Sequence, residues 1–190
     1  MIDPNDFAAP FGDRPVPEPL LALLRFQNEL RGAWYSAALR LSAENRSRLA
    51  RGWSADPAFL SRLIPFARAG ASGSFYALWD PDPSRMTTPA QWPVVAFGED
   101  GGEWVVARDV RELLVIGSCD AEPRIDFDRA HYVRSEHHYR KSDGLDAYGE
   151  WLRASFQLEP VEDPDAILQA AQAEWQEELE RWVQGVLEEA

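Results

Sequence analysis

Three histidines fall in one stretch of the chain, near acids and the single cysteine, a combination of residue types that could bind a metal. The residues concerned are Cys119, Asp126, Asp128, His131, His137 and His138. Zinc sites need ligands that converge at set spacings, such as two histidines on one face of a helix. His137 and His138 are adjacent, so their side chains point to different faces of either a helix or a strand. The sequence has no second cysteine and no His-Glu-x-x-His motif, so we expect loop or surface histidines, no metal and no cofactor.

Two glycine-rich segments invite comparison with catalytic loops. Gly70-Ala71-Ser72-Gly73 is close to the Gly-x-Ser-x-Gly turn of a serine nucleophile, but its spacing is wrong by one residue. Gly98-Glu99-Asp100-Gly101-Gly102 carries acids that would repel phosphate, and no Lys-Ser or Lys-Thr pair follows it. We therefore expect a chain that is not an enzyme. A hydrolase that uses two carboxylates or the histidine-rich stretch stays open, because thirty-two acids guarantee close pairs.

Composition limits the classes of protein to which the chain can belong. The 190 residues are 45% apolar and 12% aromatic, which is enough for one domain with a hydrophobic core. The net charge of -13 disfavours binding to nucleic acid or to an anionic membrane and favours a basic protein partner. A single cysteine excludes an intramolecular disulfide. No signal-peptide pattern and no apolar run of ~20 residues is present, so we expect a cytoplasmic protein.

The first third of the chain predicts an arm followed by helices. Residues 1–18 are rich in proline, aspartate and small side chains, and we expect them to form an irregular arm. Apolar residues at helical spacing predict a helix that begins at Pro19, and a second helix is expected over residues 42–51. An Asp-Pro pair predicts the start of a third helix over residues 56–70, which Pro65 either interrupts or kinks.

The middle of the chain predicts β-structure. Residues 74–79 are aromatic and apolar, as in a strand, and end in a turn cluster of aspartate and proline. Residues 92–97 and 103–107 flank the second glycine-rich loop, a pattern typical of a β-hairpin. A capping-box pattern predicts a short helix over residues 109–117 that is closed by its glycine, and residues 118–142 show no clean period.

The last third predicts helices, of which the final one is strongly acidic. Residues 145–156, and the residues after Asp163-Pro164, place apolar side chains on one face. Residues 158–190 contain ten acids and one arginine, and so contribute -9 of the net charge of -13. These elements predict an α+β fold: a single domain over residues 19–190 that ends in an acidic C-terminal helix.

Four segments of the chain carry short motifs whose order and spacing can be compared with those of known families. They are Leu63–Trp79 with its Pro65-Phe66-Ala67 and Tyr76-Ala77-Leu78-Trp79, Trp92–Glu103 with its Pro93-Val94-Val95, Val105–Leu114, and Trp151–Leu158 followed by Asp163-Pro164. In this order and spacing the chain resembles the SUKH superfamily of SMI1/KNR4-like proteins over roughly residues 60–187. The resemblance implies an α+β fold in which helices pack on an antiparallel-leaning sheet.

For many bacterial members, the resemblance also implies an immunity protein, which binds and neutralises a toxin that is often a nuclease. A nuclease must attract polyanions, so an acidic inhibitor can be steered onto its basic active face and occlude it. The partner-binding residues expected at loops that border the sheet are Asp80, Asp82, Trp92, Glu99, Asp100 and Trp104. A cytoplasmic regulatory scaffold of the SMI1/KNR4 type is the alternative role, and the partner's identity and the oligomeric state stay open.

Overall fold

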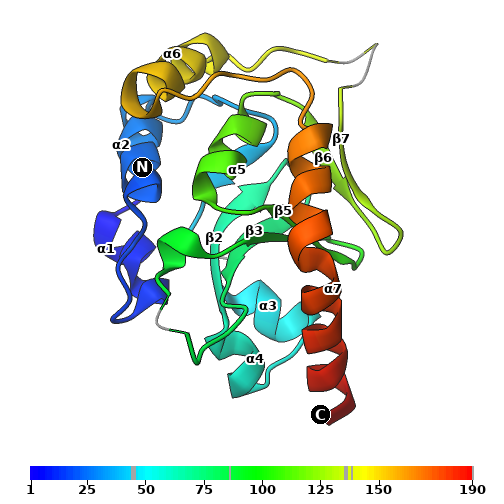
Figure 1. Ribbon diagram of the computed structural model, residues 1–190. Helices are drawn as coiled ribbons and strands as arrows, with labels where there is room; N and C mark the ends of the chain where they lie inside the picture. Colours follow the sequence, from blue (N-terminus) through cyan, green and yellow to red (C-terminus); the bar gives the residue numbers. More distant parts are fainter. Residues whose placement is uncertain (44–45, 86, 135–136, 138, 190) are drawn as a thin grey trace.

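A five-stranded antiparallel sheet forms the centre of the molecule in the computed structural model (Figure 1). The structure describes residues 1–43, 46–85, 87–134, 137 and 139–189. The strands follow sequence order across the sheet and are β1 (Leu39–Leu41), β2 (Leu63–Ala69), β3 (Phe75–Trp79), β4 (Val94–Phe97) and β5 (Glu103–Ala107). Each strand pairs antiparallel with the next. With the helices that pack on this sheet, the predicted α+β fold is confirmed.

Helices cover both faces of this sheet, and a separate two-stranded hairpin accompanies it. The helical segments are α1 (Pro4–Ala8), η1 (Ala9–Phe11), α2 (Glu18–Glu29), α3 (Arg46–Gly52), α4 (Pro57–Ser61), η2 (Pro89–Gln91), α5 (Val110–Gly117), α6 (Leu145–Phe156) and α7 (Asp165–Glu189). The hairpin consists of β6 (Glu122–Ile125) and β7 (Ala130–Val133). In Figure 1, α1, α2 and α6 lie to one side of the sheet, and α7 runs along the other with its C-terminal end near α3 and α4.

Both faces of the sheet are buried. Successive strand residues point to opposite faces, so Tyr76 and Leu78 of β3 pack with α2, α5 and α6, whereas Phe75, Ala77 and Trp79 pack with α3, α4 and α7. All residues of β3 and β4 are buried. An antiparallel sheet with one solvated face would alternate apolar and polar residues, and these strands are apolar throughout because both sides are covered.

The acidic C-terminal helix covers the second face with its aromatic side. The Trp182 ring of α7 stacks on Phe59 and Trp79, with centroid separations of 5.1 and 5.6 Å. Trp175 meets Trp79 edge-on at 6.5 Å. Aromatic pairs at such separations contribute roughly 0.5–1.5 kcal/mol each beyond the area that they bury. Glu177 lies on the exposed side, so the predicted division of this helix into an aromatic face and an acidic face is confirmed.

The N-terminal segment does not form the irregular arm that its composition suggested. The Asp3 side chain caps α1, and the Phe7 and Phe11 rings are each 1% exposed in the main core. The backbone of Ile2 exchanges two hydrogen bonds with the side chain of Asn28 on α2, at 2.8 and 2.9 Å. The arm prediction is wrong because the aspartate and the proline that suggested irregular structure serve here as a helix start.

The single helix expected over residues 56–70 is wrong as well, because two elements occupy this range. Asp56 caps the short helix α4 as predicted, but the chain then enters β2. Pro65 lies in this strand where the pairing register shifts between Pro65 and Ala67, and a bulge is where a sheet tolerates proline. The run from Leu63 to Ala67 is apolar at every position, so it fits a buried strand as well as a helix.

The stretch without a clean period, residues 118–142, contains the β6–β7 hairpin and is held by a buried aspartate. Gly117 is not the left-handed cap that was expected, since α5 ends on Ser118 with right-handed φ and ψ of -75° and -15°. The Asp120 side chain is 0% exposed and accepts four hydrogen bonds at 2.7 to 3.0 Å. Its donors are the amides of Ala37 and Ser142 and the hydroxyls of Tyr139 and Ser142.

The free edge of β1 is capped by one glutamine side chain. The Gln27 amide group accepts a hydrogen bond from the Leu41 N–H at 2.9 Å and donates one to the Leu41 carbonyl at 3.2 Å. The Tyr35 hydroxyl donates a further hydrogen bond to Gln27 Oε1 at 2.9 Å. Gln27 is 6% exposed, so its amide supplies partners to backbone groups that would otherwise be buried without them.

The opposite edge, β5, is capped in the same way from α7. Gln176 Oε1 accepts a hydrogen bond from the Val105 N–H at 2.9 Å, and Gln176 Nε2 donates one to the Glu103 carbonyl at 3.3 Å. In both places a side-chain amide replaces the backbone of a further strand. An uncapped edge strand is a template for pairing with another chain, and these two glutamines occupy the groups that such pairing would use.

Replacing Gln27 with leucine is expected to lower the free energy of unfolding by about 2–4 kcal/mol, because the Leu41 backbone groups and the Tyr35 hydroxyl lose their partner. Gln176→Leu is expected to cost less, since Gln176 is only half-buried and water can reach its partners. Urea unfolding measures both effects. Gln169→Leu, on the exposed side of α7, is the matched control and should change stability by about 0.5 kcal/mol or less. Equally small changes in all three variants would contradict the role of the caps.

Candidate protein-binding surface

The residues expected to bind a partner do not form one surface. Those that follow β3 lie at the opposite end of the sheet from those that follow β4, because the two strands are adjacent and antiparallel. The four residues of β4 separate these ends by roughly 13 Å. The resulting groups are Asp80, Asp82 and Trp92 at one end and Glu99, Asp100 and Trp104 at the other.

Two members of the first group lie in the interior. Trp92 is 2% exposed, its Nε1 donates to the Thr87 hydroxyl at 3.0 Å, and the Arg14 guanidinium covers its ring at 5.3 Å from the centroid. Asp80 is 5% exposed. A partner has no access to either side chain, so the structure places Trp92 and Asp80 in the packing of the sheet end and not on a binding surface.

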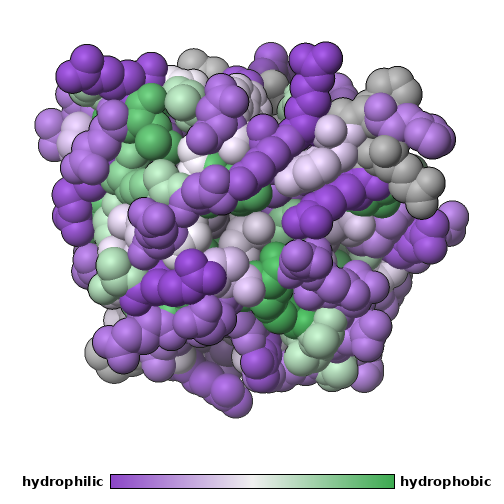
Figure 2. Space-filling model, turned by 90° about the horizontal axis from the view of Figure 1, so that it is seen from above, coloured by the Kyte–Doolittle hydropathy of each residue, from purple (hydrophilic) through white to green (hydrophobic). Residues whose placement is uncertain are grey.

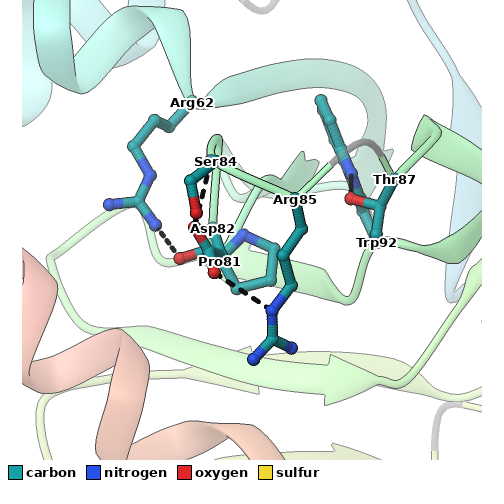
Figure 3. A network of polar contacts seen from close by, with 7 residues as sticks. All are labelled: Arg62, Pro81, Asp82, Ser84, Arg85, Thr87 and Trp92. Carbon is teal, nitrogen blue, oxygen red and sulfur yellow. Dashed lines mark hydrogen bonds and ion pairs between the residues drawn. The ribbon is translucent and has the colours of Figure 1, made fainter.

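The loop after β3 is held by its own polar contacts (Figure 3). The Asp82 carboxylate accepts hydrogen bonds from the Ser84 hydroxyl and amide at 2.5 and 3.0 Å, and it pairs with Arg85 at 3.1 Å. The Ser84 hydrogen bonds hold the pKa of Asp82 below its usual range. Arg62 Nε donates to the Asp80 carbonyl at 2.7 Å, and its guanidinium also reaches the next carbonyl along the chain. These contacts engage Asp82 within the loop and tie Arg62 to the loop backbone.

The second group lies where two hairpin turns meet. The β6–β7 turn covers the β4–β5 turn, and Trp104 Nε1 donates to the Asp126 carbonyl at 2.8 Å across this contact. Gly101 and Gly102 have φ angles of 109° and 83°. A Cβ atom on Gly101 would collide with the Phe127 ring, and one on Gly102 would collide with the Asp126 backbone. Both glycines are therefore required for the turn conformation and for the close approach of the second hairpin.

Phe127 lies at the tip of the β6–β7 hairpin and is 78% exposed. The Asp126 carboxylate shapes this tip, since it accepts hydrogen bonds from the amides of Asp128 and Arg129 at 2.9 and 3.0 Å. These bonds also hold the pKa of Asp126 below its usual range. A large ring presented to solvent on a hydrogen-bonded turn makes Phe127 a candidate binding residue, because aromatic residues, including Phe, are enriched in protein interfaces.

We define the hairpin-tip surface by the exposed residues of the two turns. They are Glu99, Asp100, Asp126, Phe127, Asp128 and Arg129. Four carboxylates against one guanidinium give this surface a net charge of -3. Glu99 and Asp100 were among the residues predicted to bind a partner, whereas Phe127 was not. The signal in the sequence was an aromatic residue between two aspartates, outside any apolar period. Figure 2 shows the molecule from above the view of Figure 1, where hydrophobic residues lie in separate areas among hydrophilic ones.

The histidine-rich stretch does not assemble a metal site from the residues that the structure describes, which contain no group of three or more His, Cys, Asp or Glu placed to hold an ion. Asp126 is used in the hairpin turn, and burial raises the pKa of the Cys119 thiol to about 11. His131 Nδ1 is buried without a hydrogen-bond partner, His137 is exposed, and His138 lies outside the described residues. The absence of a metal in the protein stays a prediction.

Asp80 and Asp82 are the carboxylates that come closest to a hydrolase pair. Burial raises the pKa of Asp80, although a hydrogen bond from the Asp82 amide and the charge of Arg62 act to lower it. The pKa of Asp82 is lowered. Opposite shifts of this kind are typical of an acid–base pair. Asp80 is covered by its own loop, however, and its Oδ1 has no partner. The pair lacks the open site that a hydrolase needs.

No helix in the described part of the chain is long and apolar enough to cross a membrane. Comparison with known proteins identified no family model, no curated protein and no solved structure that matches this chain. The resemblance to the SUKH superfamily therefore stays a prediction from the order of motifs.

The raised pKa of Asp80 predicts a pH-dependent gain in stability for Asp80→Asn. The folded state holds this proton more tightly than the unfolded state does, so protonation of Asp80 stabilises the fold. This contribution is complete below the ordinary aspartate pKa of about 4. It is lost as the pH rises through the raised pKa of Asp80. Asparagine mimics the protonated form. The variant should melt at a higher temperature than wild type at about pH 7, and the difference should shrink on acidification towards about pH 3.

Thermal melting followed by circular dichroism at a series of pH values measures this difference. Asp13→Asn, which changes an exposed aspartate, is the matched control and should show no such trend. A lower melting temperature for Asp80→Asn near neutral pH would contradict the prediction and would mean that attraction to Arg62 outweighs the cost of burial.

Proposed function

We propose that this chain is a non-catalytic protein-binding domain, an immunity protein that neutralises a cognate toxin in the cytoplasm by covering its active face. The observation that carries the proposal is the ring of Phe127, 78% exposed on a hydrogen-bonded turn and surrounded by carboxylates. The sequence motifs that resemble the SUKH superfamily support the immunity role. Binding of this kind requires no chemistry by the chain itself.

The charges of the surface favour a basic partner. The hairpin tip carries a net charge of -3 within a chain of -13, so a positive surface is attracted from a distance and oriented as it approaches. Phe127 can enter an apolar pocket at the centre of the contact, with the acids forming a polar rim around it. A nuclease toxin fits both requirements, because its active face has to attract the phosphates of nucleic acid.

The rigidity of the tip supports the same role. The ring of Phe127 lies against Gly101, and Trp104 ties the two turns together through the Asp126 carbonyl. The interface therefore exists before the partner arrives, and little conformational freedom is lost on binding. Preorganisation of this kind raises affinity without additional contacts.

Co-expression with the toxin-like product of a neighbouring gene is expected to rescue growth of the host. Phe127→Ser should abolish the rescue and weaken the purified complex by roughly 30-fold or more, which corresponds to a hot-spot loss of about 2 kcal/mol. Because Phe127 is mostly exposed, the variant should keep its fold, which circular dichroism can check. Phe127→Leu, which keeps an apolar side chain, should bind with intermediate affinity.

Three outcomes would change this conclusion. Rescue that survives Phe127→Ser combined with Asp100→Asn would keep the immunity role but place the interface elsewhere. A complex without rescue would favour the regulatory scaffold. The absence of both complex and rescue with the wild-type chain would contradict the immunity role itself.

The association rate constant for the toxin is expected to fall as ionic strength rises, while the dissociation rate constant changes little. Asp100→Asn should lower the association rate at low salt, because Asp100 lies on the hairpin tip and makes no ion pair with a described residue. Asp13→Asn removes the same charge beside Arg14, at the other end of the sheet, and should have a smaller effect, since screening limits charge effects to about 10 Å. Stopped-flow mixing over a range of salt concentrations measures both variants, and equal effects would argue against the tip as the contact.

A further inference from the structure

A cleft of about 540 Å³ opens between the N-terminal segment, α2 and the edge strand β1. It lies at the opposite edge of the sheet from β5, and none of the residues that line it belongs to the hairpin-tip surface. The volume falls within the range of about 300–1,000 Å³ that is usual for small-molecule sites. Its charged lining residues are Arg40 and Arg68 from the sheet and Asp3 and Asp6 from the N-terminal segment.

Two arginines occupy one side of this cleft. Arg40 of β1 and Arg68 of β2 are directly opposite each other in the strand pairing. Like charges in such positions destabilise a sheet. Neither guanidinium forms an ion pair with an acid among the described residues, although the chain holds thirty-two acids. The pair therefore leaves a local concentration of positive charge within an acidic protein.

Arg40 is held in position without being neutralised. Its Cζ lies 4.7 Å from the centroid of the Trp34 ring, and both terminal nitrogens lie 3.5 Å from the Gly32 carbonyl. The adjoining wall is fixed as well, because Asn28 is engaged by the backbone of Ile2 at 2.8 and 2.9 Å. A ligand that enters the cleft meets groups that are already ordered, which lowers the entropic cost of binding.

We propose that this cleft binds a small organic molecule through a phosphate or carboxylate group held jointly by Arg40 and Arg68. Guanidinium groups bind both kinds of oxyanion through paired hydrogen bonds, which a lysine cannot form. The remaining volume and the Trp34 ring, which is 40% exposed, accommodate the organic part of the ligand. Asp3 and Asp6 line the same cleft and oppose a bare anion, so contacts to the organic part have to add to the affinity. This inference does not depend on the proposed immunity function.

Isothermal titration of the full chain at low salt with phenyl phosphate, benzoate and inorganic phosphate tests the proposal. At least one of the two aromatic probes should bind saturably and more tightly than inorganic phosphate, and their order distinguishes a phosphate ligand from a carboxylate ligand. If none of the three probes binds saturably, the proposal is wrong.

Substitutions locate the binding site. Arg68→Gln should weaken binding of the better probe by roughly tenfold or more, because it removes one of the two guanidiniums. Arg68→Lys keeps the charge without the paired donors and should give a smaller loss; it also serves if Arg68→Gln fails to fold. Asp6→Asn should strengthen binding a few-fold. Arg25→Gln, an exposed arginine paired with Glu18 outside the cleft, is the matched control and should leave the affinity unchanged.

The signs of these changes separate a specific site from general attraction between charges. Loss of a positive charge anywhere would weaken anion binding if only the total charge mattered, so equal losses in Arg68→Gln and Arg25→Gln would overturn the proposal. Wild-type affinity in a folded Arg68→Gln variant would overturn it as well.

Discussion

The structure depends on one constraint: a five-stranded antiparallel sheet has to be covered on both faces and closed at both edges. Helices α2, α5 and α6 cover one face, and α3, α4 and α7 cover the other. The edges are closed by two glutamine side chains, Gln27 on β1 and Gln176 on β5, each of which bonds to a backbone N–H and a backbone carbonyl. Helix α7 serves both purposes, because its tryptophans pack on the second face while Gln176 reaches the edge.

This coverage restricts where a partner can bind. With both faces covered and backbone groups of both edge strands capped, the turns that join the strands are the parts of the described sheet that offer a surface to another protein. At the end that carries Asp80, Asp82 is paired within its own loop, and both Asp80 and Trp92 are buried. At the other end, the glycines of the β4–β5 turn allow a second hairpin to pack closely and present Phe127 to solvent. The position of the candidate binding surface therefore follows from the way in which the sheet is closed.

The sequence predicts the parts of this fold that local rules determine. The β4–β5 hairpin follows from two apolar runs around a glycine-rich loop, and α7 follows from an apolar stripe at helical spacing. Strand β2 was missed because a run that is apolar at every position has no period, and proline was taken as a helix kink where a bulge accommodates it. Phe127 was missed for a different reason. Its exposure depends on the contact with Gly101, a residue of another hairpin, and no local pattern encodes that contact.

The distribution of charge gives the two candidate sites opposite requirements. Residues 158–190 contribute -9 of the net charge, and α7 contacts β5, at the sheet edge opposite the arginine pair on β1 and β2. Screening confines the effect of individual charges to about 10 Å. The proposed basic partner would be attracted by the acidic tip and by the net charge of the chain as a whole. An anionic ligand is repelled by the chain as a whole and bound only at contact range, where Arg40 and Arg68 are not neutralised. The two proposed ligands differ in charge and would bind to different elements, so occupation of one site would leave the other accessible.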